Sequence, residues 1–366
     1  MEKQLIIIGN GFDLMAGLKS KYSDFFKWYF SDRDSRYTAR QNKEINFWKE
    51  LFWERKKCSE SEKNMNWSDI ESTIEKLLVI IEKEFSEEDY HFYAVMDGPT
   101  NKVMSLKMNT LKVGISKKEI FVELYNDLKK FESDFAEFLV NEIAENVKYA
   151  DNANQLVSEL IVREYLQKSN FKSADEYYEE RNIFIDSSSE NTKRQLLSFN
   201  YTHETNDSAF INAKVFNNVH GNIADKNIIF GIDGHKLVGR QLLLPFTKTY
   251  RMMMNSMERF ELTSDIEYIK FFGHGLAEAD YSYFQTIFDD VDLYNGNTKL
   301  IFYYNVYNEE KRKEIIEEQH LGIVNLIQKY GETLDNKDHG KNMMHKLLLE
   351  GRVKMEEIRS KEVLAE

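Results

Sequence analysis

The residues best able to carry chemistry in this chain are His220 and Asn200. An imidazole titrates near neutral pH, so His220 is the best candidate for a general base. Asn200 cannot act as an acid or a base, but its amide can orient a substrate hydroxyl or a water by hydrogen bonds. Both residues also have an ordinary structural interpretation, because a histidine at a strand end often only makes hydrogen bonds and asparagine is a common turn former.

A glycine motif near the N-terminus, Gly9-Asn10-Gly11 with Asp13 behind it, is typical of a phosphate-binding turn. It follows an apolar run and precedes a segment with helix-like spacing, and such a turn lets backbone N–H groups approach a phosphate. It is half of the G-x-G-x-x-G fingerprint, since Leu14 holds the third glycine position, and a turn that binds nothing fits it equally well. If it binds a nucleotide, Gly11→Val should block binding and leave the fold intact.

Polar clusters follow four predicted strands. They are Asn10 and Asp13; Asn200, Tyr201 and Thr202; His220, Gly221 and Asn222; and Gly273, His274 and Gly275. Ligands of open parallel sheets bind at the carboxyl ends of the strands. We therefore expect a pocket where these clusters converge, with the backbone of the Gly273–Gly275 turn contacting ribose or phosphate.

The elements that must position these residues are short strands separated by helices. Strands are predicted at Gln4–Ile8, Gln195–Phe199, Val215–Val219, Ile228–Ile232, Tyr268–Phe272 and Leu300–Tyr304. Helices are predicted at Lys19–Phe30, Thr247–Phe260, Ala279–Leu293 and Asn308–Tyr330. Strands alternating with helices predict an α/β fold with a largely parallel, Rossmann-like sheet.

The middle of the chain has a helical pattern. Ser116 and Glu119 form a capping-box pair at the start of a long helix. A loop is predicted around Glu87–Val113, which contains Gly98 and Pro99. The predicted organisation is a discontinuous core at 1–30 and 192–335, a large helical insertion at 31–191, and a charged helical tail at 336–366, helical from Lys346.

Composition narrows the function classes. The chain has 366 residues and a net charge of −13. This negative charge argues against extensive binding to the phosphate backbone of nucleic acid. With Cys58 as its single cysteine, it can form neither an intrachain disulfide nor a Cys-rich zinc site, so we expect no bound zinc. No apolar stretch reaches membrane-spanning length, and Leu5–Ile8 is too short for a signal-peptide core, so a cytoplasmic protein is expected. No G-x-S-x-G elbow surrounds Ser198, and no carboxylate cluster suggests a metal-dependent nuclease.

Five blocks of the sequence resemble the AbiH-type bacteriophage abortive infection proteins. The most specific block is LIIIGNGFDLMAGLKSKYSDFF at 5–26. The later blocks are NWSDIE at 66–71, SFNYT at 198–202, VHGN at 219–222 and GHGLAEAD at 273–280. Together they span roughly residues 5–305, and the resemblance implies a role in antiphage defence.

In the same order, these blocks are similar to the sirtuin-like NAD-binding fold. That resemblance places Gly9, Asn10 and Gly11 on the first nucleotide-binding turn, and Ser198 and Asn200 on the second segment. It makes His220 the base, and it puts Gly273, His274 and Gly275 on the adenosine-side turn. This chain departs from the pattern at Thr202, where an aspartate is expected, and in lacking the zinc-binding cysteines of protein-deacetylating sirtuins.

The preferred hypothesis is an antiphage protein that cleaves the nicotinamide–ribose bond of NAD, with Asn200 orienting ribose or water and His220 as base. NAD is then its substrate or ligand, and Gly9, Asn10, Gly11, Asp13 and Ser198 line the site with the 273–275 turn. The rival is a non-catalytic nucleotide-binding sensor or scaffold whose helical insertion binds a phage or host protein. Homo-oligomers are compatible with both hypotheses.

Overall fold

The computed structural model describes residues 3–30, 45–58, 67–85, 96–112, 114–166, 173–188, 194–202, 215–234, 237, 239–255, 262, 265–276 and 280–359. These residues form two compact units. The first unit consists of residues 1–19, 143–219 and 258–366, and the second of residues 20–142 and 220–257. None of the described helices is long and apolar enough to cross a membrane.

The first unit is built on a six-stranded sheet in which every neighbouring pair is parallel. Its strands are β1 (Lys3–Ile8), β2 (Arg194–Ser198), β3 (Val215–Asn218), β4 (Ile266–Phe272), β5 (Lys299–Tyr304) and β6 (Val353–Glu357). Their order is β3-β2-β1-β4-β5-β6, which is the order of the Rossmann fold. The predicted α/β fold with a parallel, Rossmann-like sheet is confirmed, and β1, β2 and β4 lie side by side in it as predicted.

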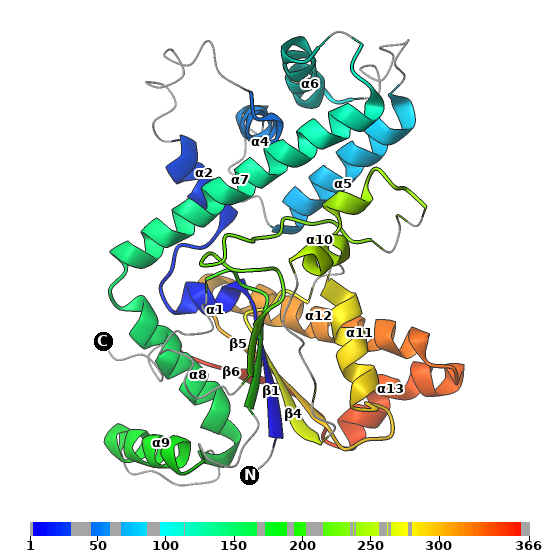
Figure 1. Cartoon of the computed structure of the whole chain (residues 1–366). Coiled ribbons are helices and arrows are strands. Elements are labelled where there is room, and N and C mark those ends of the chain that lie inside the picture. Colours follow the sequence, from blue (N-terminus) through cyan, green and yellow to red (C-terminus); the bar gives the residue numbers. More distant parts are fainter. Residues whose placement is uncertain are drawn as a thin grey trace. The chain divides into compact units, whose positions relative to one another are not determined.

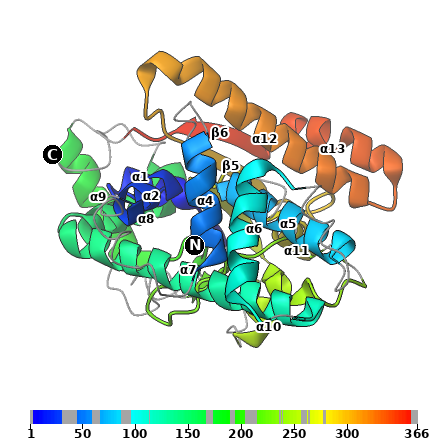
Figure 2. The same cartoon turned by 90° about the horizontal axis from the view of Figure 1, so that it is seen from above.

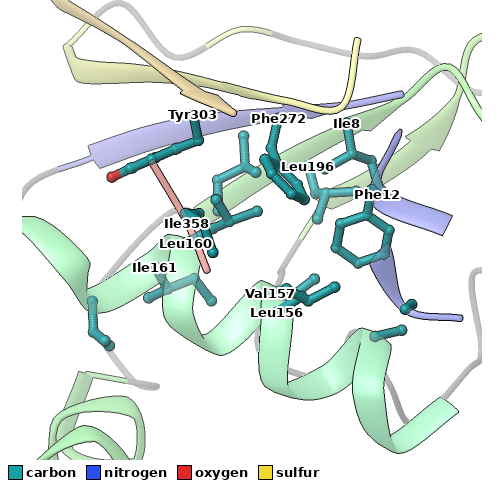
Figure 3. Packing of buried hydrophobic residues seen from close by; sticks show 14 of the residues in the cluster. Ile8, Phe12, Leu156, Val157, Leu160, Ile161, Leu196, Phe272, Tyr303 and Ile358 are labelled. Atoms are coloured by element: carbon teal, nitrogen blue, oxygen red, sulfur yellow. The ribbon is translucent and has the colours of Figure 1, made fainter. Parts of the chain in front are cut away.

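Helices cover both faces of this sheet (Figure 1). They are α1 (Asn10–Met15), α8 (Tyr149–Leu166), α9 (Ala174–Ser188), α11 (Tyr281–Asp290), α12 (Arg312–Thr333) and α13 (Lys337–Leu349), with a 3-10 turn, η7, at Glu309–Lys311. The buried side chains of α8 pack on one face against alternate residues of the strands, among them Ile8, Leu196 and Phe272 (Figure 3). On the other face Phe284 of α11 contacts Phe271. Burial on both faces explains why the strands are apolar runs rather than alternating patterns.

The second unit is mainly helical, as predicted for an insertion between the first two strands. Its helices are α2 (Tyr22–Phe30), α4 (Phe47–Cys58), α5 (Trp67–Glu84), α6 (Gly98–Thr110), α7 (Lys117–Glu145, of which 117–142 belong here) and α10 (Lys248–Met254), with a 3-10 turn, η5, at Leu244–Phe246. In Figure 2, α4 and α6 lie side by side. The predicted capping box opens α7, since the backbone N–H of Ser116 donates to Glu119 at 2.9 Å and that of Glu119 to Ser116 Oγ at 3.3 Å.

Buried ion pairs join the helices of this unit. Arg251 of α10 makes a bidentate contact with Glu132 of α7. Lys248 lies 3.0 Å from Glu71, and Lys107 of α6 lies 2.8 Å from Asp127 of α7. Because each of these charges has a partner, helices that carry charged residues on their inward faces can still pack together.

Three sequence predictions need correction. Ile228–Ile232 is not a strand. Among the described residues its only bridge joins Ile232 to Thr247, and the N–H groups of Ile229 and Phe230 donate to His220 O and to the Glu132 carboxylate. Its apolar character reflects burial, not sheet pairing.

The loop predicted at 87–113 contains a helix, α6. This helix starts at Gly98 because Asp97 caps it and Pro99 suits the first turn. Residues 86–95 and 113 lie outside the described part.

The charged segment from Lys346, predicted as a helix, is helical only through Leu349 and then forms β6. Gly351, at φ +63°, makes the turn between the two, and the alternation in Val353–Glu357 suits an edge strand. Part of the helix predicted at Thr247–Phe260 falls on residues 256–260, which lie outside the described residues. The compact unit that contains the sheet also contains α8 and α9, and the predicted domain ranges stay a prediction.

Candidate functional site

The two glycine turns that follow β1 and β4 pack directly against each other through their backbones. Gly9 N donates to Phe272 O at 3.0 Å, and Gly11 N donates to Gly273 O at 2.8 Å. A Cβ on Gly9 would lie 2.6 Å from the Cα of His274, and a Cβ on Gly11 would lie 2.7 Å from the Cα of Gly273. Glycine is therefore required at both positions by the contact between the turns.

This contact changes the expected role of the first turn. The N–H of Gly11 is used by Gly273 and that of Phe12 by Gly9, so neither is left to cradle a phosphate. Asn10, by contrast, is exposed at the start of α1. The expectation that Gly11→Val would leave the fold intact is wrong, because its side chain would meet the backbone of the neighbouring turn.

Asn200 and Ser198 lie at the carboxyl end of β2, next to the first turn. Asn200 Nδ2 donates to Gly9 O at 3.1 Å, and the backbone N–H of Asn200 donates to Ser198 Oγ at 3.1 Å. Both side chains are buried. The structure thus brings together three predicted clusters, those that follow β1, β2 and β4, at one edge of the sheet.

A buried hydroxyl–carboxylate cluster lies behind this edge. Asp13 accepts hydrogen bonds from Tyr149 at 2.9 Å and from Thr202 at 2.8 Å, and Tyr149 lies 3.2 Å from the Thr202 hydroxyl. All three residues are at most 5% exposed. The sequence analysis missed Tyr149, the first residue of α8. A helical pattern predicts a helix but does not show which strand end the helix will contact.

His274 is held rigidly in the turn after β4. Its Nδ1 accepts the Leu276 N–H at 3.0 Å, and its Nε2 lies 3.3 Å from the Asp280 carboxylate. Since Nδ1 accepts a hydrogen bond, a neutral ring carries its proton on Nε2, the nitrogen that lies near Asp280. The ring also packs edge-on against Phe199, and Leu276 adopts φ +51°. A bulky residue in the left-handed region is strained, and such strain concentrates at functional turns. Gly275, by contrast, is exposed.

His220 follows β3 in the chain and opens the second segment of the other compact unit. It is 2% exposed, and its carbonyl oxygen accepts the Ile229 N–H at 2.9 Å. The convergence of His220 with Asn200 stays a prediction. Within the described residues, no three His, Cys, Asp or Glu side chains are grouped as metal ligands would be, and the prediction that the protein binds no zinc also remains to be tested.

The sequence matches a model of a known protein family. The model of the family described as bacteriophage abortive infection AbiH matches residues 5–304. The chain belongs to the AbiH family. A search of curated proteins and a search of solved structures found no match. The AbiH match runs from within β1 to the end of β5, and therefore includes every strand end discussed above.

The AbiH family places this protein in antiphage abortive infection. Among the sequence blocks that resemble the family, Asn66 and 277–279 lie outside the described residues. The remaining glycine, asparagine and histidine blocks include the turns that meet at the carboxyl edge of β1, β2 and β4. This edge is the candidate functional site of this AbiH-family protein.

Proposed function

We propose that this AbiH-family protein binds NAD at the carboxyl edge of its sheet and cleaves the nicotinamide–ribose bond. The observation that carries the proposal is the strand order. From β1 the chain builds the sheet toward β2 and β3 on one side and toward β4, β5 and β6 on the other. The strand order therefore reverses between β1 and β4, which is where open parallel sheets bind nucleotides. The Gly9 and Gly273 turns flank this position.

The proposal assigns a separate role to each candidate residue. Asn10 and Gly275 are exposed to solvent, where a ligand can reach them, whereas Asn200 is buried behind them. Asn200 orients the ribose or the water, and His220 is the base. Asp13 supplies a carboxylate next to Thr202, where the sirtuin resemblance leads us to expect an acidic residue.

The proposed reaction is a hydrolysis. Water attacks C1′ of the nicotinamide ribose, and the bond from C1′ to the ring nitrogen breaks with its electron pair going to nicotinamide. The base takes the proton of the attacking water. The products are nicotinamide and ADP-ribose, and the loss of NAD from an infected cell would account for abortive infection.

The test is incubation of the purified full-length protein with NAD, with chromatography for nicotinamide and calorimetry for binding. The proposal expects nicotinamide release that Asn200→Ala and His220→Ala each reduce. Absence of nicotinamide release by the wild type, alone and with phage lysate as trigger, would refute cleavage.

A second candidate, a nucleotide-binding sensor that does not cleave NAD, is favoured by one specific observation. The Asn200 amide and the Gly11 and Phe12 N–H groups already serve the packing of the turns. In this version the helical unit contacts a phage or host protein, and the exposed Met253 and Met254 of α10 are adaptable contact residues. NAD binding without nicotinamide release would identify this function.

A further inference from the structure

Arg194, the first residue of β2, carries a buried charge. It is 2% exposed. Its register partner on β1 is Gln4, whose Nε2 donates to Ile161 O of α8 at 3.3 Å, so both side chains lie on the sheet face that α8 covers. This is the amino end of β2, whereas the candidate nucleotide site lies beyond its carboxyl end.

The guanidinium of Arg194 lacks a compensating carboxylate among the described residues. Within that part of the chain, its Nε and Nη2 have no hydrogen-bond partner, and the Oε1 of Gln4 beside it has none either. Two carboxylates of the overlying helix form ion pairs with other cations. Glu164 pairs with Lys270, and Glu159 pairs with Arg163 at 2.7 Å.

An unpaired buried charge is unusual because its desolvation is not offset by any attraction. Arg251 shows the ordinary solution in this protein, since its buried guanidinium makes two hydrogen bonds to Glu132. Burial lowers the pKa of the Arg194 guanidinium, and Tyr165 acts in the opposite direction. Arginine nonetheless stays charged in proteins, so an anion that is not part of the described chain would complete the site.

We propose that Arg194 and Gln4 form a binding site for a hydrogen phosphate group, either free phosphate or a phosphate monoester. The guanidinium fork donates from Nε and Nη2 to two phosphate oxygens, the geometry in which arginine binds oxyanions. The Oε1 of Gln4 accepts from a P–OH group. The site therefore favours a protonated phosphate over sulfate, which carries no hydroxyl near neutral pH.

The experiment is thermal unfolding and calorimetry of the full-length protein at constant ionic strength. Sodium chloride is exchanged for inorganic phosphate, glycerol 2-phosphate or sulfate. The wild type is expected to gain melting temperature with phosphate in a saturable way and less with sulfate. A larger gain with glycerol 2-phosphate identifies a monoester as the ligand, and a larger gain with inorganic phosphate identifies the free ion.

Two variants test whether the response to phosphate arises from binding at Arg194 and Gln4. Arg194→Met removes the charge, and Gln4→Glu supplies an internal carboxylate to Arg194. Both should lose at least about tenfold in phosphate affinity, because two charge-assisted hydrogen bonds are removed or already occupied. In chloride, Arg194→Met should melt at or above the wild-type temperature, because it removes a buried charge that has no carboxylate partner among the described residues.

Arg359→Met is the matched control, since it makes the same charge change on a side chain that is 62% exposed. It should keep the phosphate response of the wild type. Two outcomes would overturn the proposal: an equal phosphate response in the wild type and in both site variants, or no phosphate response in the wild type.

Discussion

The hydroxyl of Thr202 donates to the carboxylate of Asp13 at 2.8 Å, across 189 residues of sequence. This bond links the segment after β2 to α1, and Tyr149 attaches the start of α8 to the same carboxylate. The buried carboxylate of Asp13 thus connects three segments at this edge of the sheet: α1, the segment after β2 and the start of α8.

Thr202→Val should therefore destabilise the protein without changing its fold. It removes one buried hydrogen bond, which is worth about 0.5–1.5 kcal/mol. Tyr149→Phe should cost a similar amount, and the double variant should deviate from additivity because both donors share Asp13. Urea denaturation of the four proteins measures the coupling. Strictly additive effects would mean that the three groups do not act as a unit.

His220→Ala tests the proposed base. If His220 removes a proton in the rate-limiting step, the NAD-cleavage rate should fall by roughly 10²–10⁴-fold, with much less effect on NAD binding. Activity of the wild type should rise with pH through the imidazole titration, because the neutral ring is the working form. A structural role would give a lower melting temperature and unchanged turnover per folded molecule, so both are measured on one preparation.

The turn contact predicts a clear difference among glycines. Gly273 has φ +70°, and a Cβ there would lie 2.2 Å from the N of Phe12, so Gly273→Ala should cost at least about 2 kcal/mol. Gly11→Ala should also be strongly destabilised. Gly275→Ala is the control, since a Cβ there would have no other atom within 4 Å among the described residues, and it should stay within about 0.5 kcal/mol of the wild type. Thermal melts would refute this account if the three variants behaved alike.

Arg251→Met should destabilise the helical unit by roughly 3 kcal/mol, because it leaves the buried Glu132 carboxylate without its bidentate partner. Lys129, at 3.3 Å from Glu132, compensates only in part since it is 39% exposed. Adding Glu132→Gln should recover much of the loss, because glutamine keeps an acceptor for the Phe230 N–H and carries no charge. Chemical denaturation measures both variants, and a double variant no more stable than Arg251→Met would contradict this explanation.

Deprotonation of Tyr281 should contribute to the unfolding of the protein at alkaline pH. Burial, with Glu332 and Asp289 nearby, raises its pKa to about 12 from an ordinary value of 10.0. The folded state holds the phenolic proton more tightly than the unfolded chain, so this contribution is fully present below pH 10 and is lost as pH rises through 12. Tyr281→Phe should flatten the loss of stability between these values. Identical pH profiles of melting temperature would exclude the effect.

The sheet could be predicted from sequence because its central strands are apolar runs that end in polar or glycine residues. Ile228–Ile232 has the same composition and is not a strand, since composition reports burial and not hydrogen-bond partners. Pro99 suggested a loop because proline marks both loops and first helical turns. The meeting of Gly9, Asn200 and Gly273 followed from the strand-end rule.

Other features of the site could not be predicted from the sequence. The contact between the Gly11 and Gly273 turns depends on how closely two backbones approach, and no residue pattern encodes that distance. The position of Tyr149 against Asp13 depends on the direction of α8 over the sheet. Similarly, an arginine in a sequence gives no sign that it will be buried without a carboxylate beside it, as Arg194 is among the described residues.

Asn200 and Gly9 are separated by 191 residues along the chain, and β1 pairs on one side with β2 and on the other with β4. During synthesis at about 5–20 residues per second, β1 would wait roughly 10–40 s before β2 emerges from the ribosome. Throughout that interval its apolar residues have neither neighbour in the sheet. The central strand is thus synthesised well before both of its neighbours, and Leu5–Ile8 can be buried within the sheet only after β2 and β4 have emerged.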